Sequence, residues 1–133
     1  MWVLAVLGAH WYLSLFTQTF FHHRYAAHRM FTMNKGWEKF FYVISFFFQG
    51  SSYLRPRAYG IMHRMHHAYA DTELDPHSPK YDPNLFAMIW RTRNTYKNIY
   101  DQEVEVEAKF MKDLPDWDSF DKFASNGYIR LVW

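Results

Sequence analysis

The chain has no cysteine among its 133 residues. This absence excludes disulfides, thiolate zinc sites and iron–sulfur clusters held by cysteine. The net charge of +2, with histidine counted as neutral, is too small to indicate a nucleic-acid partner. Residues 1–23 also contain no Asp, Glu, Lys or Arg. The chain therefore divides into an apolar beginning and a more polar remainder, and its chemistry must come from side chains other than thiols.

The apolar beginning predicts a transmembrane helix over residues 1–23. A helix of about 20 residues rises about 30 Å, the thickness of the hydrocarbon core. A secretory signal is the alternative, but this segment has no basic start and continues into FFHHR instead of a small-residue cleavage site. The basic residues that follow, Arg24, Arg29, Lys35 and Lys39, indicate that the histidines face the cytoplasm.

The remaining segments predict short helices joined by loops, so the expected fold class is all-α. A second uncharged run, 40–54, would rise only about 22 Å, which favours an interfacial or re-entrant helix. Three prolines make 71–84 a loop. We expect a helix against the membrane surface over 85–100 and an amphipathic helix over 101–112. A polar linker over 115–123 and the start of another membrane helix over 126–133 complete the expected organisation.

Six histidines form two tight clusters: His22, His23 and His28 in the first, and His63, His66 and His67 in the second. Offsets of three and four place the second cluster on one side of a helix. Neutral imidazole suits Zn, Cu, Fe and Ni. The Glu-x-x-His motif of carboxylate di-iron bundles and the His-Glu-x-x-His motif of zinc proteases are both absent. The pattern predicts a metal site made wholly or almost wholly of histidine.

The spacing of His23 and His28 constrains that site. Five residues along a regular α-helix rotate the side chain by about 500°, which leaves the two rings about 140° apart. They can bind one metal only if the helix ends or loosens between them. Otherwise each of them serves a different metal.

Three segments resemble the motifs of membrane fatty acid desaturases. HRYAAH, 23–28, is similar to the first histidine box of that family and is followed by Arg29. HRMHH, 63–67, is similar to the second box, and 75–77 reads D-P-H, as in the family segment that follows it. The resemblance is to the Δ9-type acyl-CoA and acyl-lipid branch and extends over essentially the whole chain.

The resemblance implies a centre of two iron ions with five ligands on this chain: His23, His28, His63, His66 and His67. Asp75 and His77 are candidates for groups that support those ligands from behind. It further implies O2 as co-substrate and a cis double bond introduced into a long-chain acyl substrate, linked to coenzyme A or to lipid. Electrons would come from a separate donor such as cytochrome b5 or ferredoxin, since no flavin or nicotinamide motif is present.

Two departures from the family pattern matter. The family has a third box, H-x-x-H-H, whereas no histidine follows His77. We therefore expect residues 1–133 to be a partial desaturase domain of a multi-pass integral membrane protein, inactive alone. Ile61 and Met62 stand where acyl-CoA members often carry an Arg-Asp pair, which leaves the acyl carrier open.

Two other functions remain as alternatives. A membrane hydroxylase acting on a lipid, an alkane or a carotenoid would use the same boxes. A metal transporter would place its ligands near the bilayer midplane on broken helices, whereas these histidines lie beside Arg and Lys.

Arg91, Arg93 and Lys97 form a basic stretch on the helix expected over 85–100. Small redox carriers are generally acidic, so this stretch is a candidate docking surface for the electron donor. Attraction of the same cations to anionic membrane lipid is the competing interpretation.

Overall fold

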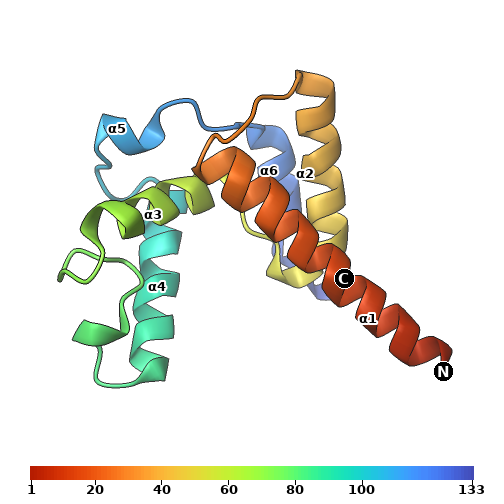
Figure 1. The fold of residues 1–133 in the computed structure, drawn as a ribbon, viewed down its shortest axis with the longest axis horizontal. Coiled ribbons are helices and arrows are strands. Elements are labelled where there is room, and N and C mark those ends of the chain that lie inside the picture. Colours follow the sequence, from red (N-terminus) through yellow and green to blue (C-terminus); the bar gives the residue numbers. More distant parts are fainter.

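The computed structural model describes residues 1–133 and is all-helical, which confirms the predicted fold class (Figure 1). Its elements in order are α1 (Trp2–Thr17), the π-helix η1 (Gln18–Ala27), α2 (Lys35–Gln49), the 3-10 turn η2 (Gly50–Ser52), α3 (Pro56–Tyr69), the 3-10 turn η3 (Pro79–Tyr81), α4 (Leu85–Tyr100), α5 (Ala108–Met111), α6 (Asp118–Ala124) and α7 (Gly127–Val132).

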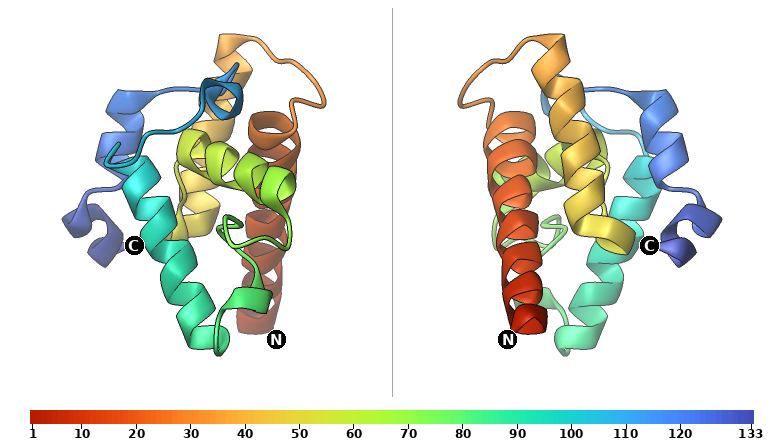
Figure 2. Two further views of the ribbon diagram at one scale, coloured as in Figure 1. Left: turned by 90° about the vertical axis from the view of Figure 1, so that its left-hand side faces the viewer. Right: turned by 90° about the vertical axis from the view of Figure 1, so that its right-hand side faces the viewer.

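The first half of the chain is a helical hairpin in which α1 and η1 pack against α2 (Figure 2). The Asn34 side chain caps α2 by accepting a hydrogen bond from the Trp37 N–H at 3.0 Å. The helix ends at Gly50, whose φ of 55° lies in the region that glycine adopts without strain. Buried Tyr25 of η1 donates a hydrogen bond to Glu38 of α2, which fixes the upper end of the hairpin.

Helix α3 crosses the end of η1, and this crossing places the two histidine clusters together. A Cβ at Gly60 would lie at an ordinary contact distance of 3.5 Å from the Ala26 carbonyl oxygen but only 2.6 Å from the Leu114 side chain, so Gly60 makes room for Leu114. Two small apolar clusters flank the crossing. One is built on Ala58, Ile61, Ile99 and Phe110, and the other on Phe21, Tyr25 and Tyr42.

The transmembrane helix predicted over 1–23 differs from the observed structure. No helix of the chain has both the length and the apolar character that crossing a membrane requires. Helix α1 contains 16 residues, and the π-helical turns that continue it carry Gln18, His22, His23 and Arg24.

The predictions for the middle of the chain agree better with the structure. The run at 40–54 becomes the end of α2, followed by η2, and its position in a membrane interface stays a prediction. The loop over 71–84 is confirmed, with the single turn η3 inside it. The helix over 85–100 is confirmed as α4.

Two predictions near the end of the chain are wrong. The helix over 101–112 is reduced to α5, because α4 closes at Tyr100 and Gln102 then adopts a φ of 58°. The linker over 115–123 contains α6, because Trp117 and Phe120 pack on Tyr42 of α2. The segment 126–133 is mostly helical, as α7.

Candidate metal centre

The π-helix brings His23 and His28 to the same side of the chain. Its characteristic hydrogen bond joins residues five apart, and here the His28 N–H donates to the His23 carbonyl at 3.0 Å. Residues five apart are therefore one turn apart, and the two Nε2 atoms lie 3.2 Å from each other. The helix is therefore loosened between the two histidines, which is the alternative that allows them to bind one metal.

The second cluster lies on a regular α-helix. Pro56 occupies the first turn of α3, where its missing N–H leaves no bond unmade. His63 and His67 are four residues apart on one face, with their Nε2 atoms 3.0 Å apart. The crossing of α3 over η1 brings His63 Nε2 to 3.1 Å from His28 Nε2. One nitrogen from each of His23, His28, His63 and His67 lies within 4.8 Å of all the others.

These four nitrogens fit a single metal ion. Imidazole nitrogens bound at about 2.0–2.1 Å would lie about 3.4 Å apart around a tetrahedral ion and about 3.0 Å apart at adjacent octahedral positions. Three of the six separations, between His23 and His28, His28 and His63, and His63 and His67, are 3.0–3.2 Å and agree with this, and all six lie within 4.8 Å. Hydrogen bonding explains the cluster less well, because His28 Nε2 has one proton or one lone pair for two neighbouring nitrogens. A shared cation uses all four lone pairs.

The protonation state of the cluster also suits a metal. Burial, together with the neighbouring His23 and His67, lowers the pKa of His63 to about 4. The pKa of His28 is lowered by burial and by His23. Both rings are thus neutral at neutral pH, and a neutral ring has a free lone pair for coordination.

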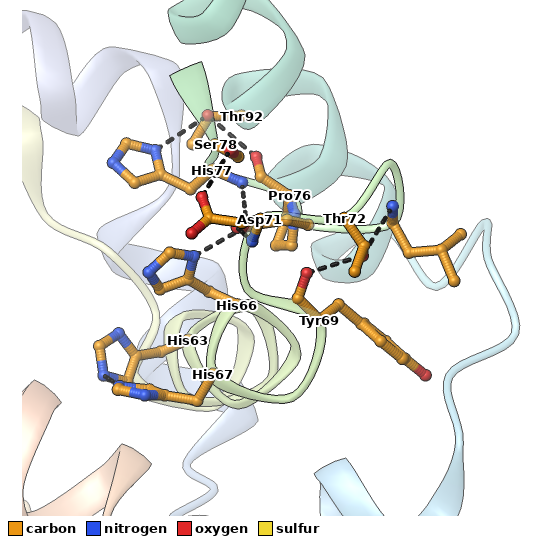
Figure 3. Close-up of polar contacts among 12 residues, drawn as sticks. His63, His66, His67, Tyr69, Asp71, Thr72, Pro76, His77, Ser78 and Thr92 are labelled. Carbon is orange, nitrogen blue, oxygen red and sulfur yellow. Dashed lines mark hydrogen bonds and ion pairs between the residues drawn. The ribbon is translucent and has the colours of Figure 1, made fainter. Parts of the chain in front are cut away.

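His66, the fifth predicted ligand, lies outside the four-nitrogen cluster. In Figure 3 the rings of His63 and His67 lie together, whereas the ring of His66 lies nearer His77. The His66 Nδ1 donates to Asp75 Oδ1 at 2.8 Å. Because an ionised carboxylate only accepts hydrogen bonds, the Nδ1 of His66 carries its proton and the Nε2 lone pair is free.

The buried carboxylate of Asp75 stays ionised. Burial acts to raise its pKa, but the hydrogen bonds from His66 and from the backbone N–H groups of His77 and Asp71 outweigh burial, so the pKa is lowered. A charged Asp75 is the stronger acceptor for the His66 ring. Asp75 therefore contacts His66 directly, and its support of a metal ligand stays a prediction.

His77 contacts α4. Its Nδ1 lies 3.1 Å from Thr92 Oγ1, and the Thr92 hydroxyl donates to the Pro76 carbonyl at 3.1 Å. The Thr92 oxygen is therefore the acceptor and His77 Nδ1 the donor. The ring centres of His66 and His77 lie 5.9 Å apart.

Two residues with structural roles were missed from the sequence. Arg64 donates to the carbonyl oxygens of Ala26 and Ala27 at the end of η1, and to those of Phe110 and Lys112. The signal was its place inside the second box.

His22 is the second of them. It is fully buried, and its Nε2 donates to the Leu54 carbonyl at 2.8 Å. This bond attaches η1 to the segment that leads into α3. His22 therefore contributes no nitrogen to the four-nitrogen cluster and has a structural role.

The basic stretch on α4 is largely paired. Arg91 forms an ion pair with Asp82 at 2.7 Å, and Lys97 forms one with Asp101 at 2.6 Å. Arg93 lies over the Trp90 ring at 5.0 Å. Docking of an electron donor on this stretch stays a prediction.

Comparison with known proteins identifies the family. The family model described as fatty acid desaturase matches residues 1–117, a segment that contains both histidine clusters and the D-P-H loop. No curated protein and no solved structure matches the chain. The chain belongs to the fatty acid desaturase family.

Proposed function

We propose that this chain forms the histidine-rich part of an oxygen-dependent, di-iron desaturase of the Δ9 type, which introduces a cis double bond into a long-chain acyl group. The observation that carries the proposal is the convergence of four imidazole nitrogens within 4.8 Å in a chain of this family. The donors come from two helices that are distant in sequence. A merely structural role would not require four imidazole rings to face one point.

The proposed ligands divide between two irons. His23, His28, His63 and His67 would hold one iron, and His66 would offer its Nε2 to the second. Iron bound here would supply the oxidation chemistry, with O2 as co-substrate. Asp75 keeps the His66 ring in the tautomer that coordinates, and Arg64 fixes the end of η1 beside α3.

The reaction balances as follows. Two hydrogen atoms leave adjacent carbons of the acyl chain, and the C–C single bond becomes a double bond. O2 takes up these two hydrogens together with two electrons and two protons, and two molecules of water form. The electrons come from a separate donor, such as cytochrome b5 or ferredoxin.

Membrane lipid and the acyl substrate belong to the same proposal, with an integral membrane protein and a cytoplasmic active site. Large apolar side chains are exposed along α1, among them Trp2, Leu4, Leu7 and Trp11. Contiguous exposed apolar surface is typical of a lipid or protein contact. The acyl carrier, coenzyme A or lipid, is left to the assay.

The test is product analysis with both acyl carriers. The full-length protein that contains residues 1–133 is supplied with O2, an electron donor and a saturated acyl substrate, and the products are analysed by mass spectrometry. A desaturase product lacks two hydrogens, whereas a hydroxylase product gains one oxygen atom from O2. His63→Ala should abolish the product. His10→Ala, which changes an exposed histidine on α1, should leave it unchanged. An oxygenated product, or activity that survives His63→Ala, would contradict the proposal.

A further inference from the structure

Arg91 of α4 holds the loop that supports His66. Its Nε and Nη2 atoms form a two-pronged pair with the Asp82 carboxylate at 2.7–3.1 Å. The same guanidinium donates to the carbonyl oxygens of Ser78, at 2.8 Å, and of Asp75. The side chain is only 28% exposed, and that of Asp82 is 9% exposed. Arg91 thus binds the loop at three residues.

Asp75 contacts both Arg91 and His66. Its backbone carbonyl accepts from Arg91, while its carboxylate accepts from His66 Nδ1 and from two backbone N–H groups of the loop. The carboxylate can face His66 only while the backbone of residue 75 stays against α4. The direction of the His66 ring therefore depends on a residue 25 positions further along the chain.

We propose that Arg91 is a positioning residue for His66, acting through the 75–78 loop and the Asp75 carboxylate. The inference rests on the proposed function, in which His66 is a ligand. An arginine is needed because its planar fork reaches a carboxylate and two carbonyls at once. A lysine supplies one point charge and cannot satisfy all three acceptors.

The neighbouring Arg93 provides a matched control. It lies on the same helix and carries the same charge. Its contacts are the Trp90 ring and a marginal 3.5 Å approach to Asn94, and none reaches the loop. Removing Arg93 changes the charge of α4 as much as removing Arg91 does, but leaves the loop attached.

The first readout is the tautomer of His66 in the metal-free protein, measured by NMR on 15N-labelled histidine and assigned with His66→Gln. Wild type and Arg93→Ala should show the ring with its proton on Nδ1. Arg91→Ala should show a mixture with the Nε2–H form, and Arg91→Lys a smaller fraction of it. If Arg91→Ala keeps the wild-type tautomer, the proposal is wrong.

Asp82→Asn covers the case in which Arg91→Ala does not fold. It leaves Arg91 in place but removes the charge that orients it, so the His66 tautomer should shift in the same direction. An unchanged tautomer in folded Asp82→Asn and in Arg91→Lys would overturn the proposal.

The second readout is metal binding at each ring, with Zn2+ as a redox-inert probe. Loss of a group that supports a ligand from behind typically lowers metal affinity about 10–100-fold. Arg91→Ala should weaken Zn2+ binding at His66 by about tenfold or more and leave binding at His63 unchanged. Arg93→Ala should leave Zn2+ binding at both rings unchanged. Equal weakening at both rings would contradict a role specific to His66. If no histidine ring of the wild type responds to Zn2+, the proposed metal centre is wrong. The tautomer of His66 then still tests the role of Arg91.

Discussion

The two histidine-bearing helices solve the same geometric problem in different ways. On η1, an i to i+5 hydrogen bond places His23 and His28 on one side. On α3, the ordinary α-helical repeat of about 100° per residue turns His66 away from His67. The π-helix therefore places two histidines five residues apart on the same side. The α-helix points His66 in a different direction from His63 and His67. The backbone repeat, and not only the motif, decides which histidines share a metal.

Removing a ring from the centre of the four-nitrogen cluster should have the largest effect. His63 Nε2 is near the Nε2 atoms of both His28 and His67. Loss of a group that supports a ligand lowers metal affinity by up to about 100-fold. His63→Ala removes a proposed ligand itself, so the affinity of the four-nitrogen cluster for metal should fall by much more than about 100-fold. Isothermal titration with Zn2+ measures this, with exposed His10→Ala as control. A loss of less than about tenfold would show that His63 is not a ligand.

His22 and His23 are neighbours on the π-helix but differ in role: His22 is buried and structural, whereas His23 is a proposed metal ligand. His22 has a pKa of about 4, because burial disfavours its charged form. The unfolded chain, with a histidine pKa near 6.5, binds the additional proton, so stability of the metal-free protein falls as pH drops from about 6.5 to about 4. The loss from His22 is on the order of 3 kcal/mol, at about 1.4 kcal/mol per pH unit.

Denaturation at several pH values tests the role of His22. His22→Gln, which keeps a donor for the Leu54 carbonyl, should reduce the loss of stability below pH 6.5, leaving the part due to His63 and His28, and should keep Zn2+ affinity within about threefold of wild type. An unchanged pH dependence in this variant would show that His22 is not buried in its neutral form.

An inserted residue tests the π-helix itself. An alanine inserted after Tyr25 lengthens the spacing of His23 and His28 to six, which an i to i+5 repeat no longer aligns. We expect Zn2+ affinity to fall about 10–100-fold, as for other losses of ligand orientation. An alanine inserted after Thr32, in the loop between η1 and α2, is the control. Equal affinities in the two insertions would mean that the π-helix is not needed.

Asp75→Asn should have a smaller and local effect. The amide oxygen still accepts a hydrogen bond but has lost the charge that makes the bond to His66 strong. Metal affinity at His66 should fall about tenfold, with the four-nitrogen site unchanged. NMR of the His66 and His63 rings during a Zn2+ titration separates the two sites, and an effect confined to His63 would contradict the assignment.

The sequence predicted the site better than it predicted the end of the chain. The five-residue offset of His23 and His28 predicts either a loosened helix or two different metals, because a regular α-helix turns the two rings apart. The α-helical repeat turns His66 away from His67, but which of these rings meets η1 depends on tertiary contacts: the side of α3 that packs on η1 and the position of Asp75. The structure of 101–112 was missed because Gln102 has a positive φ that no pattern revealed, so the chain cannot continue as a helix there.

The α6 segment shows the opposite error. Its aspartates favoured a solvated linker, but the Trp117 ring stacks on Phe120 and both pack on Tyr42. Burial of aromatic surface outweighs local polarity here. Aromatic residues at 117 and 120, three apart, were the available signal for a helix.

X-ray absorption spectroscopy of the protein loaded with one equivalent of Zn2+ tests most directly that four imidazoles share one metal and that His66 lies apart. Four imidazole nitrogens should surround the ion at about 2.0–2.1 Å. That number should stay four in His66→Ala and fall to three in His67→Ala. A wild-type site with fewer than four imidazoles, or the loss of one in His66→Ala, would contradict the account.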